Sequence, residues 1–100
     1  MTGEGRTARW ALLLEKPAGV AAWEPYRTMA TIDGTRAEAE ERFGEFVRLY
    51  RPQHPRFPVR VRRYRTGDGW MVLGDGSSGG VFAYRFLFTE LEWDSGPITH

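Results

Sequence analysis

The sequence has no cysteine, a single lysine and only two histidines among its 100 residues. The absence of cysteine excludes a disulfide, a thiolate nucleophile and any zinc site that depends on cysteine. The two histidines, His54 and His100, have no second histidine or carboxylate at ligand spacing, so no metal site is predicted. Ser77 and Ser78 have no base close by in the sequence. We therefore assign no catalytic residue and no cofactor, and favour a non-enzymatic protein over an enzyme.

Long hydrophobic runs are also missing. No stretch approaches about 18 apolar residues, and the first residues, MTGEGRTAR, lack the apolar core of a signal peptide. We expect a cytoplasmic protein that does not contact a membrane. The length fits one small domain over residues 1–100, with frayed ends at about 1–7 and 95–100. The excess of arginine over lysine is typical of a GC-rich genome and carries no information on mechanism.

One helix is predicted, over residues 35–50. Its apolar residues recur at the spacing of a single helix face: Ala39, Phe43, Phe46, Val47 and Tyr50. Thr35 and Glu38 fit a capping box, in which each side chain accepts a hydrogen bond from the backbone of the other. Pro52 disfavours helical geometry at the residue before it and ends the helix.

The rest of the chain is predicted to be strands and their connections. Alternating or β-branched and aromatic residues indicate strands over residues 9–16, 26–32, 57–65, 70–73 and 81–93. Residues 17–25 form a connector, Asp33-Gly34 a turn, 66–69 a hairpin loop and 74–80 a longer loop. The prolines at 52, 55 and 58 favour an extended path back to the sheet. The predicted fold class is α+β: a mostly antiparallel five-stranded sheet in the order β-β-α-β-β-β, with one helix on one face.

The loop over residues 74–79 matches the pattern G-x-G-x-x-G of dinucleotide-binding proteins. That pattern binds a pyrophosphate only where a helix follows it directly. Here the residues that follow, VFAYRFLF, are typical of a strand. The match is therefore interpreted as a hairpin loop rather than a cofactor site.

Positive charge is concentrated in residues 48–65, which contain seven arginines, one histidine and no acid. A strand with basic and aromatic residues on one face is typical of proteins that bind single-stranded nucleic acid. This alternative function would use Arg56, Arg60, Arg62, Arg63, Tyr64 and Arg65. Internal pairing of these arginines with Glu90 and Glu92 of the last strand is the opposing interpretation.

The last predicted strand, over residues 81–93, is apolar on both faces. Phe82, Tyr84, Phe86 and Phe88 share one face and suit the helix, whereas Val81, Ala83, Leu87, Leu91 and Trp93 share the other. A single helix covers one face only, so the second needs a curled sheet, the connector at residues 17–25 or another chain. The leading hypothesis is a small binding module that acts through protein–protein contacts, with a protein partner or a second copy at Leu87, Leu91 and Trp93.

Overall fold

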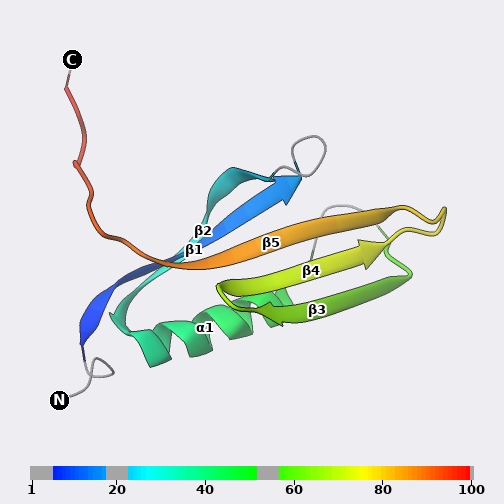
Figure 1. The fold of residues 1–100 in the computed structure, drawn as a ribbon, viewed down its shortest axis with the longest axis horizontal. Coiled ribbons are helices and arrows are strands. Elements are labelled where there is room, and N and C mark those ends of the chain that lie inside the picture. The colour runs from blue at the N-terminus through cyan, green and yellow to red at the C-terminus, as the bar shows by residue number, and fades with distance from the viewer. Residues whose placement is uncertain (1–5, 18–22, 52–56, 100) are drawn as a thin grey trace.

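A computed structural model describes residues 6–17, 23–51 and 57–99. The strands are β1 (Thr7–Pro17), β2 (Trp23–Thr35), β3 (Arg60–Thr66), β4 (Gly69–Asp75) and β5 (Val81–Glu90), and the helix is α1 (Arg36–Leu49). All four pairings between neighbouring strands are antiparallel, in the spatial order β2-β1-β5-β4-β3. The helix lies against one face of this sheet (Figure 1). The predicted α+β fold and its order of elements are confirmed.

The helix follows its sequence signals closely. Thr35 is the N-cap, and both bonds of the capping box form between Thr35 and Glu38. The Thr35 backbone N–H donates to the Glu38 carboxylate, and the Glu38 backbone N–H donates to the Thr35 hydroxyl oxygen. These two bonds leave fewer unsatisfied backbone groups in the first turn. They also hold the pKa of Glu38 below its ordinary value, chiefly through the bond from the Thr35 backbone. Tyr50 is the C-cap, so the predicted range of 35–50 includes both caps.

The core lies between α1 and the strands β1, β5 and β4. Its fully or almost fully buried apolar residues are Trp10, Leu12, Leu14, Ala39, Phe43, Val47, Trp70, Val72 and Phe86. Aromatic rings of the helix and the sheet contact one another in this core. Phe43 of α1 packs edge-to-face on Phe88 of β5, with ring centroids 5.6 Å apart. Phe46 is only partly buried and stacks on Tyr50, so Phe43 rather than Phe46 is the central aromatic residue of the helix.

Two strands differ in extent from the prediction at the N-terminal side of the chain. β2 continues through Asp33 and Gly34, where a turn was expected, because Asp33 pairs with Arg9 and Gly34 with Ala8 of β1. The Arg9 guanidinium also donates to the Asp33 carboxylate at 2.7 Å. β2 starts at Trp23, inside the predicted connector, since Trp23 is paired with Pro17.

The later strands also shift. β3 begins at Arg60 rather than at residue 57, and Phe57 and Val59 before it are exposed. β5 ends at Glu90 rather than at residue 93. Leu91 still donates its backbone N–H to Arg9 of β1, and the chain then leaves the sheet. The last pair between β1 and β5 is Trp10 with Glu90, so the final three residues of the predicted strand, 91–93, are not in β5.

Both predicted hairpin loops are present. A two-residue turn at Gly67 and Asp68 joins β3 to β4, with Thr66 opposite Gly69. The loop after β4 is shorter than the predicted 74–80, because Gly74 and Asp75 are in β4 and pair with Phe82 and Val81 of β5. The G-x-G-x-x-G match therefore spans the end of β4 and this loop, and a strand rather than a helix follows it. His54, Arg56, His100 and most of the proline-rich connection lie outside the described residues.

Candidate functional site

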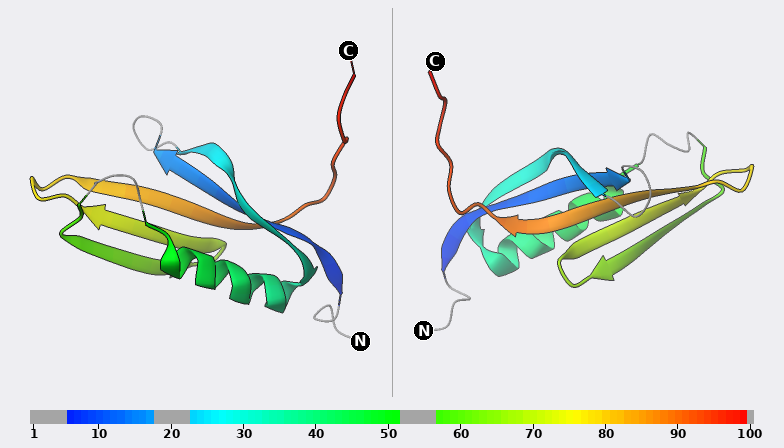
Figure 2. Two further views of the ribbon diagram at one scale, coloured as in Figure 1. Left: turned by 180° about the vertical axis from the view of Figure 1, so that it is seen from behind. Right: turned by 45° about the horizontal axis from the view of Figure 1, so that its top comes forward.

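The face of the sheet opposite α1 is here called the open face, because within residues 6–17, 23–51 and 57–99 no helix or second sheet lies on it (Figure 2). Strand register places a row of apolar side chains across its centre. All of them are partly exposed: Ala11, Leu13, Met71, Leu73, Ala83 and Leu87. Leu87 lies directly between Leu13 of β1 and Gly69 of β4, and the glycine has no side chain to cover it.

Six charged groups of the open face form three ion pairs. Arg85 bonds to Glu15 across β5 and β1, and its guanidinium lies 5.0 Å from the Trp23 ring centroid. Arg62 donates to Asp75 at 2.8 Å, which raises the pKa of Arg62, and Arg9 donates to Asp33. Three cations thus face three anions on the open face. Trp23, at the start of β2 and within the predicted connector, covers part of the open face at Arg85.

Residues 91–99, here called the arm, continue the chain beyond β5. The arm runs away from the sheet in every view, as the orange-to-red segment of Figures 1 and 2. All nine residues are exposed, including Leu91 at 40%, Trp93 at 78% and Ile98 at 66%. Leu91 and Trp93 of the predicted partner site are therefore in the arm, whereas Leu87 lies on the open face.

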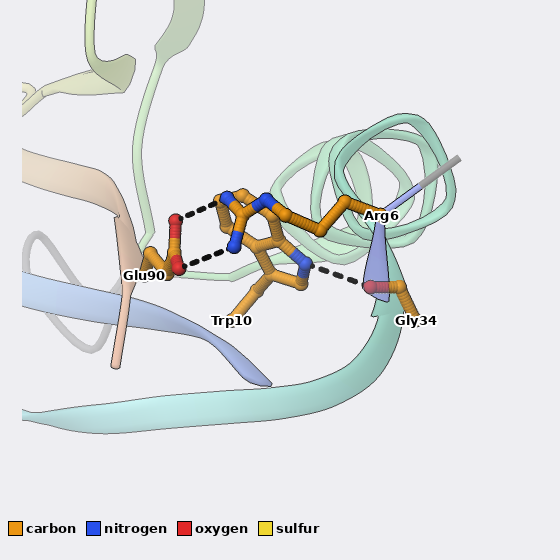
Figure 3. A network of polar contacts seen from close by, with 4 residues as sticks. All are labelled: Arg6, Trp10, Gly34 and Glu90. Carbon is orange, nitrogen blue, oxygen red and sulfur yellow. Dashed lines mark hydrogen bonds and ion pairs between the residues drawn. The ribbon is translucent and has the colours of Figure 1, made fainter. Parts of the chain in front are cut away.

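The base of the arm is fixed to the N-terminal strand. Arg6 donates two hydrogen bonds to the Glu90 carboxylate, at 2.9 and 3.1 Å, and beside them the Trp10 indole N–H donates to the Gly34 carbonyl (Figure 3). The bond from Arg6 holds the pKa of Glu90 below its ordinary value. With the backbone bond from Leu91 to Arg9, these contacts set the direction in which the arm leaves the sheet.

The arginines predicted for nucleic-acid binding are distributed over both faces of β3. Arg60, Arg62 and Tyr64 pair with open-face residues of β4, whereas Arg63 and Arg65 lie on the helix side. Arg63 donates to the Val47 carbonyl, and Arg65 bonds to Glu40 at 3.0 Å.

The opposing interpretation, in which these arginines pair with Glu90 and Glu92, does not hold for Arg60 and Arg62. β4 separates β3 from β5, so these side chains are two strands apart. Arg62 pairs with Asp75 instead, and Glu90 pairs with Arg6. Arg60 is exposed and forms no ion pair with a described residue.

Comparison with known proteins gives no family: no family model, curated protein or solved structure matches this chain. Within the described residues, no group of three or more histidine, cysteine, aspartate or glutamate side chains is placed to hold a metal ion. Among the described residues, no helix is long and apolar enough to span a membrane.

One pattern was not visible from sequence spacing. Three of the four tryptophans carry an arginine over the ring: Arg36 over Trp10 at 5.8 Å, Arg65 over Trp70 at 4.5 Å and Arg85 over Trp23. Each pair joins residues at least five positions apart in the chain. Arg65 and Trp70 are register partners in the sheet, whereas Arg36 reaches Trp10 from α1 and Arg85 reaches Trp23 across β1. Trp93 has no such partner among the described residues.

Proposed function

We propose that this protein is a non-enzymatic binding module that acts through protein contacts and forms a homodimer. The observation that carries the proposal is the arm, which projects Leu91 and Trp93 into solvent beside an open face with the apolar row around Leu87. Exposed tryptophan on an extended segment is typical of residues that dominate binding energy at interfaces. Apolar groups of this kind gain free energy when a partner removes them from water.

A second copy is the partner favoured by the charges. Six charged groups of the open face neutralise one another in three ion pairs, so these groups do not select a strongly acidic or basic protein. A second copy brings both the apolar row and the arm, and a two-fold dimer uses each of them twice. Closed symmetric dimers are also the commonest oligomers of soluble chains.

Sedimentation equilibrium over a concentration series tests the proposal. The native chain has a mass of 11.5 kDa, and we expect the weight-average mass to rise toward twice that value. Leu91→Lys should return the mass to that of the monomer. Leu91 is exposed in the single chain, and its replacement would place a positive charge in the interface. The fold should be unchanged, since only the backbone of Leu91 bonds to the sheet.

Leu49→Lys is the matched control. Leu49 is 65% exposed at the end of α1, so its replacement adds the same charge at an exposed leucine outside the proposed interface. This variant should dimerise as the native protein does. A native chain that stays monomeric at about 500 µM would overturn the proposal, because such weak association is not that of a specific dimer.

Nucleic-acid binding is the second candidate, favoured by Arg60 and Tyr64 on the open side of β3, where Tyr64 is 45% exposed. An exposed cation beside an aromatic ring can neutralise a phosphate and stack a base. Retention on single-stranded DNA or RNA at low salt tests it, and replacing Arg60 and Arg62 with alanine should weaken retention and flatten its salt dependence. Absence of retention by the native chain at low salt removes this candidate.

A further inference from the structure

Two strands of the sheet have a free outer edge, β2 and β3, since each has one neighbour among the described strands. A free edge presents backbone N–H and C=O groups that another extended chain can pair with. The arm supplies such a chain, because its first residues continue the extended path of β5. Gly96, near its end, has a φ of 69°, in the left-handed region that favours glycine.

Charge separates the two edges. The arm contains Glu92 and Asp94 and no basic residue between positions 91 and 99. β3 carries four arginines and no acid, whereas β2 carries Glu24 and Asp33 against one arginine, Arg27. Opposite charges on neighbouring strands attract and like charges repel, so an acidic arm selects the edge of β3.

The arm cannot reach that edge in its own chain by the path it takes. Its base is bonded to β1 through Leu91 and Arg9, on the side of β5 away from β4 and β3. It then runs outward from the sheet (Figure 2). The edge that an arm meets must therefore belong to a second copy.

We propose that in the homodimer the arm of one copy pairs with the free edge of β3 of the other, as a sixth strand. This inference rests on the proposed self-association and specifies how the two copies meet. Side chains alternate along a strand, so Leu91 and Trp93 share one face and Glu92 and Asp94 the other. With Trp93 on the open face, it lies along the row that Arg60, Arg62 and Tyr64 form on that side of β3.

This orientation gives Trp93 the arginine partner that the other three tryptophans already have. Arg60 is exposed and forms no ion pair with a described residue, so its guanidinium is available to stack on the indole ring. On the helix side, Glu92 faces Arg63 and Arg65, which are exposed beside their bonds to Val47 and Glu40. Each face of the added strand therefore meets side chains of matching chemistry.

Intermolecular paramagnetic relaxation tests the placement directly. The native sequence has no cysteine, so Ser95→Cys gives a single site for a nitroxide label on the arm. The chain that carries the nitroxide is not isotope-enriched, and it is mixed with a ¹⁵N-enriched chain that carries no nitroxide. Any broadening of ¹⁵N-detected amides therefore arises between copies. We expect broadening of the β3 amides and not of the β2 amides. A label at Ser78→Cys, in the exposed loop before β5, is the matched control.

A second measurement uses side-chain truncation. Trp93→Ala should raise the dimer Kd by more than about tenfold, as truncation of a central interface tryptophan does. Phe57→Ala is the matched control, because Phe57 is also an aromatic residue with 78% of its surface exposed but is outside β3 and the arm. It should leave Kd unchanged.

The outcomes separate this inference from the proposed function. A dimer that survives Trp93→Ala, or whose arm label broadens β2 rather than β3, overturns the strand addition and leaves self-association standing. A native chain that is monomeric throughout overturns both. Loss of the dimer in Trp93→Ala, together with broadening of the β3 amides by the label at position 95, establishes that the arm joins the two copies.

Discussion

Gly69 lies so close to Phe86 that a β-carbon on Gly69 would be 1.9 Å from the Phe86 carbonyl oxygen. The neighbouring atom belongs to the backbone of a central strand and cannot move aside as a flexible side chain would. We predict that Gly69→Ala destabilises the fold by more than about 4 kcal/mol, beyond the usual effect of one substitution. Gly67→Ala in the same turn should cost under about 1 kcal/mol, because its β-carbon would meet nothing within 4 Å. Urea unfolding of both variants checks this, and equal midpoints would contradict it.

The aromatic residues of α1 should differ in their contribution to stability. Phe43 is completely buried against Phe88, so Phe43→Ala should cost about 3–5 kcal/mol. Phe46 is only partly buried, and Phe46→Ala should cost about 1–2 kcal/mol, below the value for a fully buried phenylalanine. Chemical denaturation measures both free energies. A larger loss for Phe46 than for Phe43 would mean that the helix is rotated relative to this structure.

The capping box should make helix stability depend on acid. Thr35 lowers the pKa of Glu38 below its ordinary value of 4.5 in the folded chain. The carboxylate therefore stabilises the fold fully above that ordinary value, and this contribution is lost as the pH falls through the lowered pKa. The stability difference between native chain and Glu38→Ala should be constant near neutral pH and shrink below pH 4.5. Unfolding measured from pH 7 to pH 2.5 checks it, with Glu41→Ala as a control on the same helix. A difference that does not change with pH would contradict the role of the carboxylate.

The features that sequence predicted best are those decided by neighbours along the chain. The ends of α1 follow from Thr35, Glu38 and Pro52, all within a few residues of the helix. The two-residue turn at Gly67 and Asp68 is local in the same way. Such signals act over one or two turns of backbone, so they do not require knowledge of the sheet.

The features that sequence missed depend on which strands become neighbours. Asp33-Gly34 has the composition of a turn, yet it is in β2 because β1 extends to Thr7 and pairs with it. A pairing of Arg62 with Glu90 or Glu92 stayed open from sequence, because alternation alone does not show that β4 lies between β3 and β5. The partner site was divided for the same reason: Leu87 stays in the sheet, whereas Leu91 and Trp93 lie past its edge.

The adjacency of β1 and β5 has a consequence during synthesis on the ribosome. Glu15 and Arg85, which bond across these strands, are 70 residues apart in the chain. At about 5–20 residues per second, the second of them is added between about 4 and 14 seconds after the first. Until then Leu12 and Leu14 of β1 have only β2 and the helix to cover them. The edge of β1 that faces β5 therefore stays without its neighbouring strand for several seconds of synthesis.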